Sequence, residues 1–273
     1  MNPIKILREA ILFLHDIYDK KYLIYELTKR DFKQKYMANN LFGLAWAIVN
    51  PLATMLIFVL VFGVAFKGSS TTGVPFVTYL ITGIAPYFFF QGTMSQATGS
   101  LFSYAFLIKK VDFRTSILPL VKIFSELFMH CIILAMAALI LVLKGVHPTL
   151  YWFQLAYYIF AVSLLILGLS WFTSSVNLFF PDISNIVQII LSFLLYLTPI
   201  FWHPEMFPDN VVKILKLNPM YYIVDGYRNS LLFGKPFWEN WEYGLYFWGV
   251  TLIALIIGVI VFIRLKPHFA DVV

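Results

Sequence analysis

Long stretches without a single charged side chain dominate this sequence. Residues 41–66 contain none, and a second uncharged stretch covers residues 68–108. A helix needs about 20 mainly apolar residues to cross a hydrocarbon core roughly 30 Å thick. Within lipid, a spanning segment must also satisfy its own backbone hydrogen bonds, which a helix does. These stretches therefore constrain the chain to an all-α integral membrane protein.

The composition agrees with lipid exposure over much of the surface. Of the 273 residues, 60% are hydrophobic and 12% are charged, and the mean hydropathy is +0.80. A soluble domain is typically about 45–50% apolar and 25% charged. The net charge of +6 does not by itself indicate nucleic acid, because in a membrane protein the placement of Lys and Arg matters more than their sum. We therefore expect no nucleic-acid partner.

The apolar stretches predict six transmembrane helices. Pro75 and the polar residues before it delay the second one, and Pro199 with the following HPEMFPDN ends the fifth. An even number of crossings places both termini on the same side of the membrane. The predicted spans are residues 41–66, 76–97, 117–143, 150–176, 183–202 and 241–263.

Lys and Arg predict which side that is. With both termini in the cytosol, the cytosolic segments carry thirteen Lys and Arg and the opposite face carries six. Lys122 remains within the third span. Cytosolic loops are enriched in Lys and Arg. We therefore expect a multi-pass protein of the cytoplasmic membrane with both termini cytosolic.

These spans divide the chain into three parts. Residues 1–40 form a cytosolic interfacial region, residues 41–264 a single six-helix transmembrane domain, and residues 265–273 a cytosolic tail. Within the transmembrane domain, residues 98–116 form a cytosolic segment and residues 203–240 an outer-face segment.

The first forty residues are expected to lie along the membrane surface. Apolar residues recur there at helical spacing, namely Ile4, Leu7, Ile11, Leu14 and Tyr18, and such a helix can lie in the headgroup plane. The later basic residues Lys29, Arg30, Lys33 and Lys35 would attract lipid phosphates. They are the predicted site of lipid headgroup access. Anchoring by anionic lipid alone and docking of a cytosolic partner both remain open.

The stretch LNPMYYIVDGYRNSLLFGKPF (217–237) predicts a short helix before the last span. Asn218 can cap it, Pro219 suits its first turn and Gly234 can end it. About fifteen residues give roughly 22 Å at 1.5 Å per residue, which is too short to cross a bilayer. The segment is expected to be a re-entrant or outer-face helix. A folded extracellular loop with a buried ion pair is the alternative.

The polar residues of this helix can satisfy one another. Asp225 reaches Arg228 at i+3 and Asn229 at i+4, where helical side chains meet. Together with Tyr221 and Tyr222 they form the predicted outer gate.

Four stretches carry a resemblance to a known family. They are ANNLFGLAWAIVNPL (38–52), YLTPIFW (196–202), LNPMYYIVDGYRNSLL (217–232) and YFWGV (246–250). In this order they resemble the permease subunits of ABC-2 polysaccharide exporters, which move lipid-linked O-antigen, capsule or teichoic acid polymers. The chain is most similar to the teichoic acid translocation permeases of Gram-positive bacteria.

The resemblance implies a homodimer with two copies of a separate cytosolic ABC ATPase. ATP and Mg would bind to that partner, and this chain would bind no cofactor. The sequence has no P-loop of its own, since in GVAFKGSS (63–70) the lysine is displaced from the position where it could reach a phosphate. The implied function is a permease for wall teichoic acid, with a lipid-linked polymer as substrate and a Gram-positive bacterium as source.

The resemblance also implies site residues. A coupling helix would lie in GSLFSYAFLIKKVDFR (99–114), where we expect exposed Phe102, Tyr104, Phe106, Lys109 and Lys110 to contact the ATPase. An interfacial loop anchored by aromatic residues is the alternative. The first and fifth spans would line the translocation pathway, with the candidates Trp46, Asn50, Phe58, Phe193 and Tyr196.

No catalytic centre is predicted. Lys122 and Glu126 lie four residues apart and are expected to pair, and His130 is expected to be a packed, hydrogen-bonded residue. The other histidines show no metal-ligand spacing, so no metal site is expected. The chain is predicted to be a transport subunit rather than an enzyme. The rivals are an O-antigen or capsule permease and, from another class, a membrane-embedded glycosyl- or acyltransferase.

Overall fold

The computed structural model describes Phe13, His15 and residues 17–36, 43–65, 74–109 and 114–272. Within α3 the side chains of residues 44, 46, 47 and 62–65 are not described. The predicted helix over residues 4–18 falls almost entirely outside these ranges, as does Lys110. The side chain of Trp46 is also outside them. In the described ranges every regular element is helical, as the sequence predicts.

The helices follow one another with short connections. In chain order they are α2 (Lys21–Tyr36), α3 (Gly43–Ala65), α4 (Phe76–Thr98), α5 (Ser100–Ser103), α6 (Ala105–Ile108), α7 (Leu118–Leu143), α8 (Leu155–Phe179), α9 (Ile183–Leu197), α10 (Asp209–Leu215), α11 (Pro219–Arg228), α12 (Trp241–Leu265) and α13 (Phe269–Val272). Short turns extend several of them, namely η1 (Thr115–Ile117), η2 (Leu150–Gln154), η3 (Pro204–Met206), η4 (Asn229–Phe233) and η5 (Lys266–His268).

Each predicted span contains one long helix, but the helices differ in length and polarity. Among the described residues, three helical stretches are long and apolar enough to cross a membrane: Thr115–Leu143, Leu150–Phe179 and Trp241–Val272. The fifth predicted span is shorter than expected, because α9 ends at Leu197. Thr198 is extended since the residue before a proline is disfavoured in helical conformation. Fifteen helical residues reach about 22 Å.

Helix α4 occupies the centre of the bundle. It packs against α7, α8, α9 and α11, while α12 packs along α8. Leu80, Ile84 and Tyr87 on α4 are completely buried. Its threonines are buried too, and the hydroxyl of Thr93 donates to the carbonyl of Phe89 at 2.6 Å. Bonding to a carbonyl of its own helix lets this polar side chain stay in the core.

The contact between α8 and α12 depends on two glycines. A Cβ on Gly168 would lie 2.6 Å from the backbone nitrogen of Leu255. A Cβ on Gly258 would collide with the carbonyl of Gly168. The two helices therefore approach backbone to backbone, as small residues allow in membrane helices.

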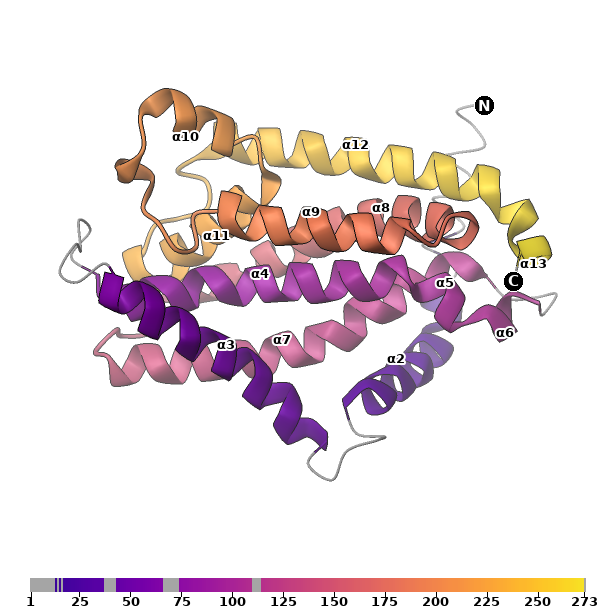
Figure 1. Ribbon diagram of the computed structural model, residues 1–273, viewed down its shortest axis with the longest axis horizontal. Coiled ribbons are helices and arrows are strands. Elements are labelled where there is room, and N and C mark those ends of the chain that lie inside the picture. Colours follow the sequence, from indigo (N-terminus) through magenta and orange to yellow (C-terminus); the bar gives the residue numbers. More distant parts are fainter. Residues whose placement is uncertain are drawn as a thin grey trace.

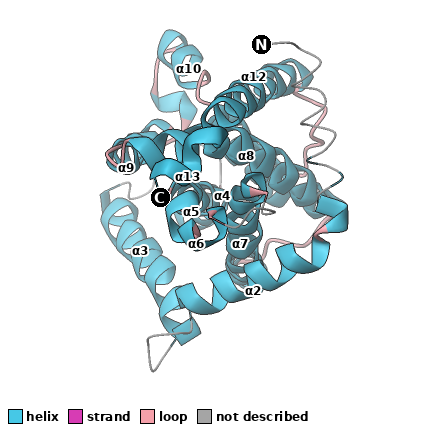
Figure 2. Cartoon of the chain, turned by 90° about the vertical axis from the view of Figure 1, so that its right-hand side faces the viewer, coloured by secondary structure: helices cyan, strands magenta, loops and turns pink. Residues whose placement is uncertain are grey.

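The bundle has two ends with different structures. Figure 1 shows α10 and α11 at one end and α5, α6 and α13 at the other. Helix α2 lies at this second end and packs against α7. In the turned view of Figure 2, α2 runs across the end of α7. The first and last described helices therefore lie at the same end of the molecule.

Candidate functional site

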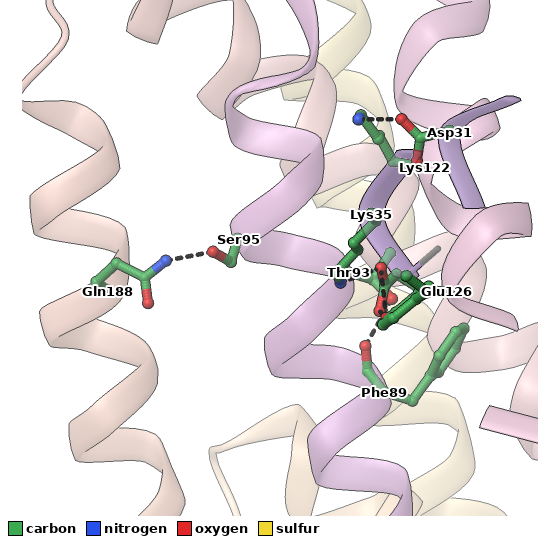
Figure 3. A network of polar contacts seen from close by, with 9 residues as sticks. Asp31, Lys35, Phe89, Thr93, Ser95, Lys122, Glu126 and Gln188 are labelled. Carbon is green, nitrogen blue, oxygen red and sulfur yellow. Dashed lines mark hydrogen bonds and ion pairs between the residues drawn. The ribbon is translucent and has the colours of Figure 1, made fainter. Parts of the chain in front are cut away.

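Helix α2 is bound to α7 by two ion pairs. The Lys122 ammonium donates to the carboxylate of Asp31, and Lys35 pairs with Glu126 (Figure 3). The hydroxyl of Tyr36 donates to Glu126 at 3.1 Å. The predicted pair between Lys122 and Glu126 is therefore wrong. Asp31 and Lys35 lie four residues apart on α2, and each pairs with the residue of opposite charge on α7. Buried charges of this kind need a partner, and here each pair joins two helices.

This pairing changes the predicted site of lipid headgroup access. Lys35 is engaged by Glu126 and is not a free cation. The guanidinium of Arg30 lies 5.4 Å from the ring of Phe106. Lys29 and Lys33 are exposed on α2. A role for Lys29, Arg30 and Lys33 at lipid phosphates stays a prediction.

The predicted coupling segment forms the two short helices α5 and α6. Phe102 and Phe106 are 43% and 47% exposed, and Lys109 is exposed as well. Tyr104 is only 4% exposed, so the expectation that it is exposed is wrong. Its hydroxyl donates to Asp31 at 3.0 Å, and burial, with Asp31 beside it, raises its pKa.

Tyr104 therefore joins three elements in one cluster. Asp31 accepts from both Tyr104 and Lys122, so the junction of α5 and α6 is connected to α2 and to α7. The sequence indicates aromatic residues in this segment, but nothing in it shows which ring points inward.

One face of α9 is exposed and carries both aromatic and polar groups. Phe193 and Tyr196 are 66% and 59% exposed. They line a shallow pocket of about 310 Å³ together with Gln188, Ile189 and Ser192. The amide of Gln188 donates to the hydroxyl of Ser95 on α4 (Figure 3). The pocket places two of the predicted pathway residues side by side.

The predicted pathway residues of α3 are only partly connected to this face. Asn50 is exposed. Phe58 packs on Phe201, with ring centroids 4.5 Å apart, and Phe201 lies 5.9 Å from Tyr196. Phe58 and Tyr196 thus belong to one aromatic cluster through Phe201.

The short helix at the opposite end has the predicted caps. The side chain of Asn218 accepts from the backbone of Met220 at 3.0 Å. Gly234 ends the following turn with φ +59°, a left-handed conformation that favours glycine. Helix α11 and turn η4 together cover residues 219–233. Helix α11 packs against α4 and α8, so it is part of the bundle rather than a peripheral loop.

The charged side chains of α11 do not pair as predicted. The amide of Asn229 does donate to Asp225, at 3.1 Å. The guanidinium of Arg228 instead lies 3.4 Å from the ring centroid of Tyr79 and donates to the carbonyls of Tyr79 and Ile200 at 3.4 and 3.3 Å. Arg228 therefore ties α11 to α4 and to the chain after α9.

The two tyrosines of the predicted outer gate are buried in an aromatic cluster. Tyr222 stacks on Phe247 with ring centroids 4.9 Å apart. Its hydroxyl lies 3.1 Å from that of Tyr157. Tyr221 contacts the edge of Tyr243 at 6.0 Å. Asp225, one turn further on, is half-buried, and burial raises its pKa despite the nearby charge of Arg228.

His130 behaves as the sequence predicts. Its Nε2 lies 2.8 Å from the hydroxyl of Tyr227, and its ring stacks on Phe89 at 4.7 Å. It is 1% exposed and links α7 to α11. Its contacts are those of a packed structural residue.

Comparison with known families identifies the family of this chain. The family model described as ABC-2 type transporter matches residues 22–232, from α2 to the turn after α11. The chain belongs to the ABC-2 type transporter family. The matched part contains α2, α5 and α6 at one end of the bundle and α10 and α11 at the other.

Several curated relatives are similar over most of their length. The chain is 31% identical over 256 residues to an O-antigen export system permease protein RfbA of Klebsiella pneumoniae, covering 92% of this chain and 94% of the relative. It is 25% identical to a protein of the same name from Myxococcus xanthus, over 80% and 83% of the two chains. It is 23% identical to the polysialic acid transport protein KpsM of Escherichia coli, over 70% and 74%.

Proposed function

We propose that this chain is the permease subunit of an ABC exporter that moves a lipid-linked cell-surface polysaccharide across the cytoplasmic membrane. Its membership of the ABC-2 family carries the proposal. The relatives named for O-antigen export and polysialic acid transport support a polysaccharide as the cargo. The helical bundle with an interfacial helix supports a membrane subunit rather than an enzyme.

The energy for export would come from a second protein. The chain lacks a P-loop, so two copies of a cytosolic ABC ATPase, with ATP and Mg bound to them, would act on a homodimer of this chain. The exposed Phe102 and Phe106 are the proposed contacts for the ATPase, together with Lys109 and Lys110. Helices α2 and α13 lie at the same end of the bundle as these aromatics, which supports cytosolic placement of both termini.

For the polymer itself there are two candidates. The motif LNPMYYIVDGYRNSLL (217–232) resembles teichoic acid permeases, which favours wall teichoic acid and a Gram-positive source. The names of the relatives favour O-antigen or capsule, and these relatives come from Gram-negative bacteria. We propose wall teichoic acid as the first candidate.

Native mass spectrometry of the tagged protein, purified gently from its own host, tests the exporter. We expect two copies of this chain with two copies of an ABC ATPase. If the chain is recovered intact but without an ATPase, under conditions that preserve known ABC complexes, the exporter proposal fails. A membrane-embedded transferase would then be the next candidate.

Depletion of the chain in its host distinguishes the two polymers. Export failure should leave a lipid-linked polymer on the cytosolic side of the membrane. Chemical analysis of that polymer would show polyol phosphate for teichoic acid, or sugars without a polyol phosphate backbone for O-antigen and neutral capsule. No accumulation of any lipid-linked polymer would contradict the proposal.

A further inference from the structure

A polar cavity lies beside α11, at the end of the bundle opposite α2. It has a volume of about 410 Å³ and is lined by Lys216 after α10, by α11, by the turn before α12 and by the start of α12. This volume is within the range of about 300–1,000 Å³ that is usual for small-molecule sites. In the proposed function this end of the molecule faces the outside of the cell.

Three aromatic side chains form part of the wall of this cavity. They are Tyr221, Trp241 and Tyr243. The hydroxyl of Tyr243 donates to the carbonyl of Lys216 at 2.6 Å, which fixes the position of the ring. Trp241 is the first residue of α12 and is 61% exposed. It therefore offers a flat apolar surface at the edge of the cavity.

The remaining wall is rich in hydrogen-bonding groups. It includes the carboxyl groups of Asp225 and Glu242 and the amide of Asn240. Glu239 also contributes, and Lys235 pairs with it at 3.1 Å. Burial raises the pKa of Asp225, so that its carboxyl group keeps a proton to higher pH than an ordinary aspartate and can then donate as well as accept.

This chemistry excludes several kinds of ligand. A lipid tail does not suit a wall with this many polar groups. The wall holds one ammonium group, that of Lys216, but three acidic side chains, those of Asp225, Glu239 and Glu242, and this excess of acidic groups disfavours a polyphosphate. Among the residues that the structure describes, no three His, Cys, Asp or Glu side chains form a group that could hold a metal ion.

A sugar ring matches both parts of the wall. Its C–H groups pack on the face of an aromatic ring, and its hydroxyls donate to carboxylate and amide oxygens. We infer that this cavity binds a neutral saccharide unit of the exported polymer as it emerges at the outer face. This inference rests on the proposed function and names the part of the cargo that the chain recognises, namely the sugar units that the polymer carries rather than a polyol phosphate backbone.

The test is saturation-transfer NMR on the purified full-length chain in nanodiscs. The probes are glucose, galactose, rhamnose and N-acetylglucosamine, each as a mono- and disaccharide, and an oligomer of glycerol phosphate. We expect transfer to at least one neutral saccharide and weaker transfer to glycerol phosphate. Transfer to glycerol phosphate alone, or to none of the probes, would overturn the inference.

Two tryptophan variants separate sugar binding from membrane anchoring. Trp241 and Trp238 are equally exposed, at 61% and 62%, but only Trp241 lines the cavity. Trp241→Leu should weaken saccharide binding about three- to tenfold, as expected for loss of one aromatic stacking contact, and Trp238→Leu should leave it unchanged. An equal loss in both variants would show that the two residues merely anchor the protein, and the cavity would not be a sugar site.

The outcome is independent of the test of the exporter itself. The binding assay uses the chain without an ATPase and without transport. If an ATPase copurifies but no saccharide binds, the proposed function stands and this inference fails. If saccharide binds to the cavity but no ATPase is found, the cavity stands and the exporter fails.

Discussion

At the scale of single residues, Arg228 shows how a buried charge holds helix α11 in place. The guanidinium is 2% exposed and bonds to two backbone carbonyls and the face of Tyr79. Arg228→Lys keeps the charge, but a compact ammonium cannot reproduce this planar contact. We expect the free energy of unfolding to fall by roughly 1.5–3 kcal/mol, the usual value of hydrogen bonds to a charged group.

Thermal unfolding in detergent measures this change. The control is Arg264→Lys, because Arg264 is exposed near the end of α12. An unchanged melting temperature for Arg228→Lys would mean that the contacts of Arg228 contribute little to stability.

Asp225 makes the stability of this end depend on pH. Burial raises its pKa above the ordinary value of 3.8, so between these two values the folded protein holds a proton that the unfolded chain has released. Stability therefore falls as pH rises from the ordinary pKa through the raised one. We expect Asp225→Asn to remove this part of the pH dependence.

The measurement is the melting temperature as a function of pH for the wild type and the variant. Asp209→Asn serves as the matched control, because Asp209 is an exposed acid on α10. Parallel curves for the wild type and Asp225→Asn would contradict a raised pKa at Asp225.

The sequence predicts the caps of α11 but not the partners of its charges. Asn218 and Gly234 act through residues beside them in the chain, so local rules are sufficient. Arg228 bonds to Tyr79, which lies 149 positions earlier. The i+3 rule considers one helix alone, and it therefore predicts a pair between Arg228 and Asp225. The same limit explains why the sequence predicts a pair between Lys122 and Glu126, whereas both side chains bind to α2.

At the scale of elements, the approach of α8 and α12 is the contact most sensitive to volume. Gly258→Ala would place a methyl group against the carbonyl of Gly168 and force the two helices apart. Overpacking of this kind typically costs about 1–3 kcal/mol. Gly249→Ala on the same helix meets nothing within 4 Å and should be neutral or stabilising by up to about 1 kcal/mol, because alanine favours helix.

Unfolding of both glycine variants in a graded denaturant series provides the comparison. The result expected is a lower midpoint for Gly258→Ala only. Equal midpoints would show that α12 can shift along α8 without loss.

The coupling segment allows a test of which aromatic residues contact the ATPase. Phe102 is exposed on α5, and Tyr104 is buried against Asp31. Phe102→Ser should reduce copurification of the ATPase about tenfold, as for a contact residue at an interface. Tyr104→Phe should leave copurification near the wild-type level. A loss in the Tyr104 variant with none in the Phe102 variant would show that the exposed face of the segment is not the docking surface.

At the scale of the whole molecule, the sequence predicts the class of fold and the order of the helices. Charge-free stretches are sufficient for that, because lipid imposes the same requirement on each of them. They do not show which face of a helix is covered. Helix α4 looks like any other span in sequence, yet it forms the centre of the bundle, whereas α9 leaves Gln188, Ser192 and Phe193 exposed.

The exposed polar groups on α9 predict where two copies of the chain meet. Ser192 and Gln188 lie on the exposed face of a membrane helix, where contact with lipid tails is unfavourable for polar groups. Leu252 on α12 is 58% exposed, and its apolar side chain is suited to contact with lipid tails. In a dimer with twofold symmetry, a residue near the axis lies opposite its own copy. We therefore expect Ser192 to lie near the twofold axis, opposite Ser192 of the second copy.

Cysteine cross-linking in membranes tests this arrangement. Cys131 is the single cysteine of the chain, and Cys131→Ser gives a background without thiols. In that background Ser192→Cys should form a covalent dimer under mild oxidation, because a disulfide requires Cβ atoms about 3.5–4.5 Å apart. Leu252→Cys should remain monomeric. Cross-linking at Leu252 but not at Ser192 would place α12 at the interface and turn the aromatic face of α9 toward lipid.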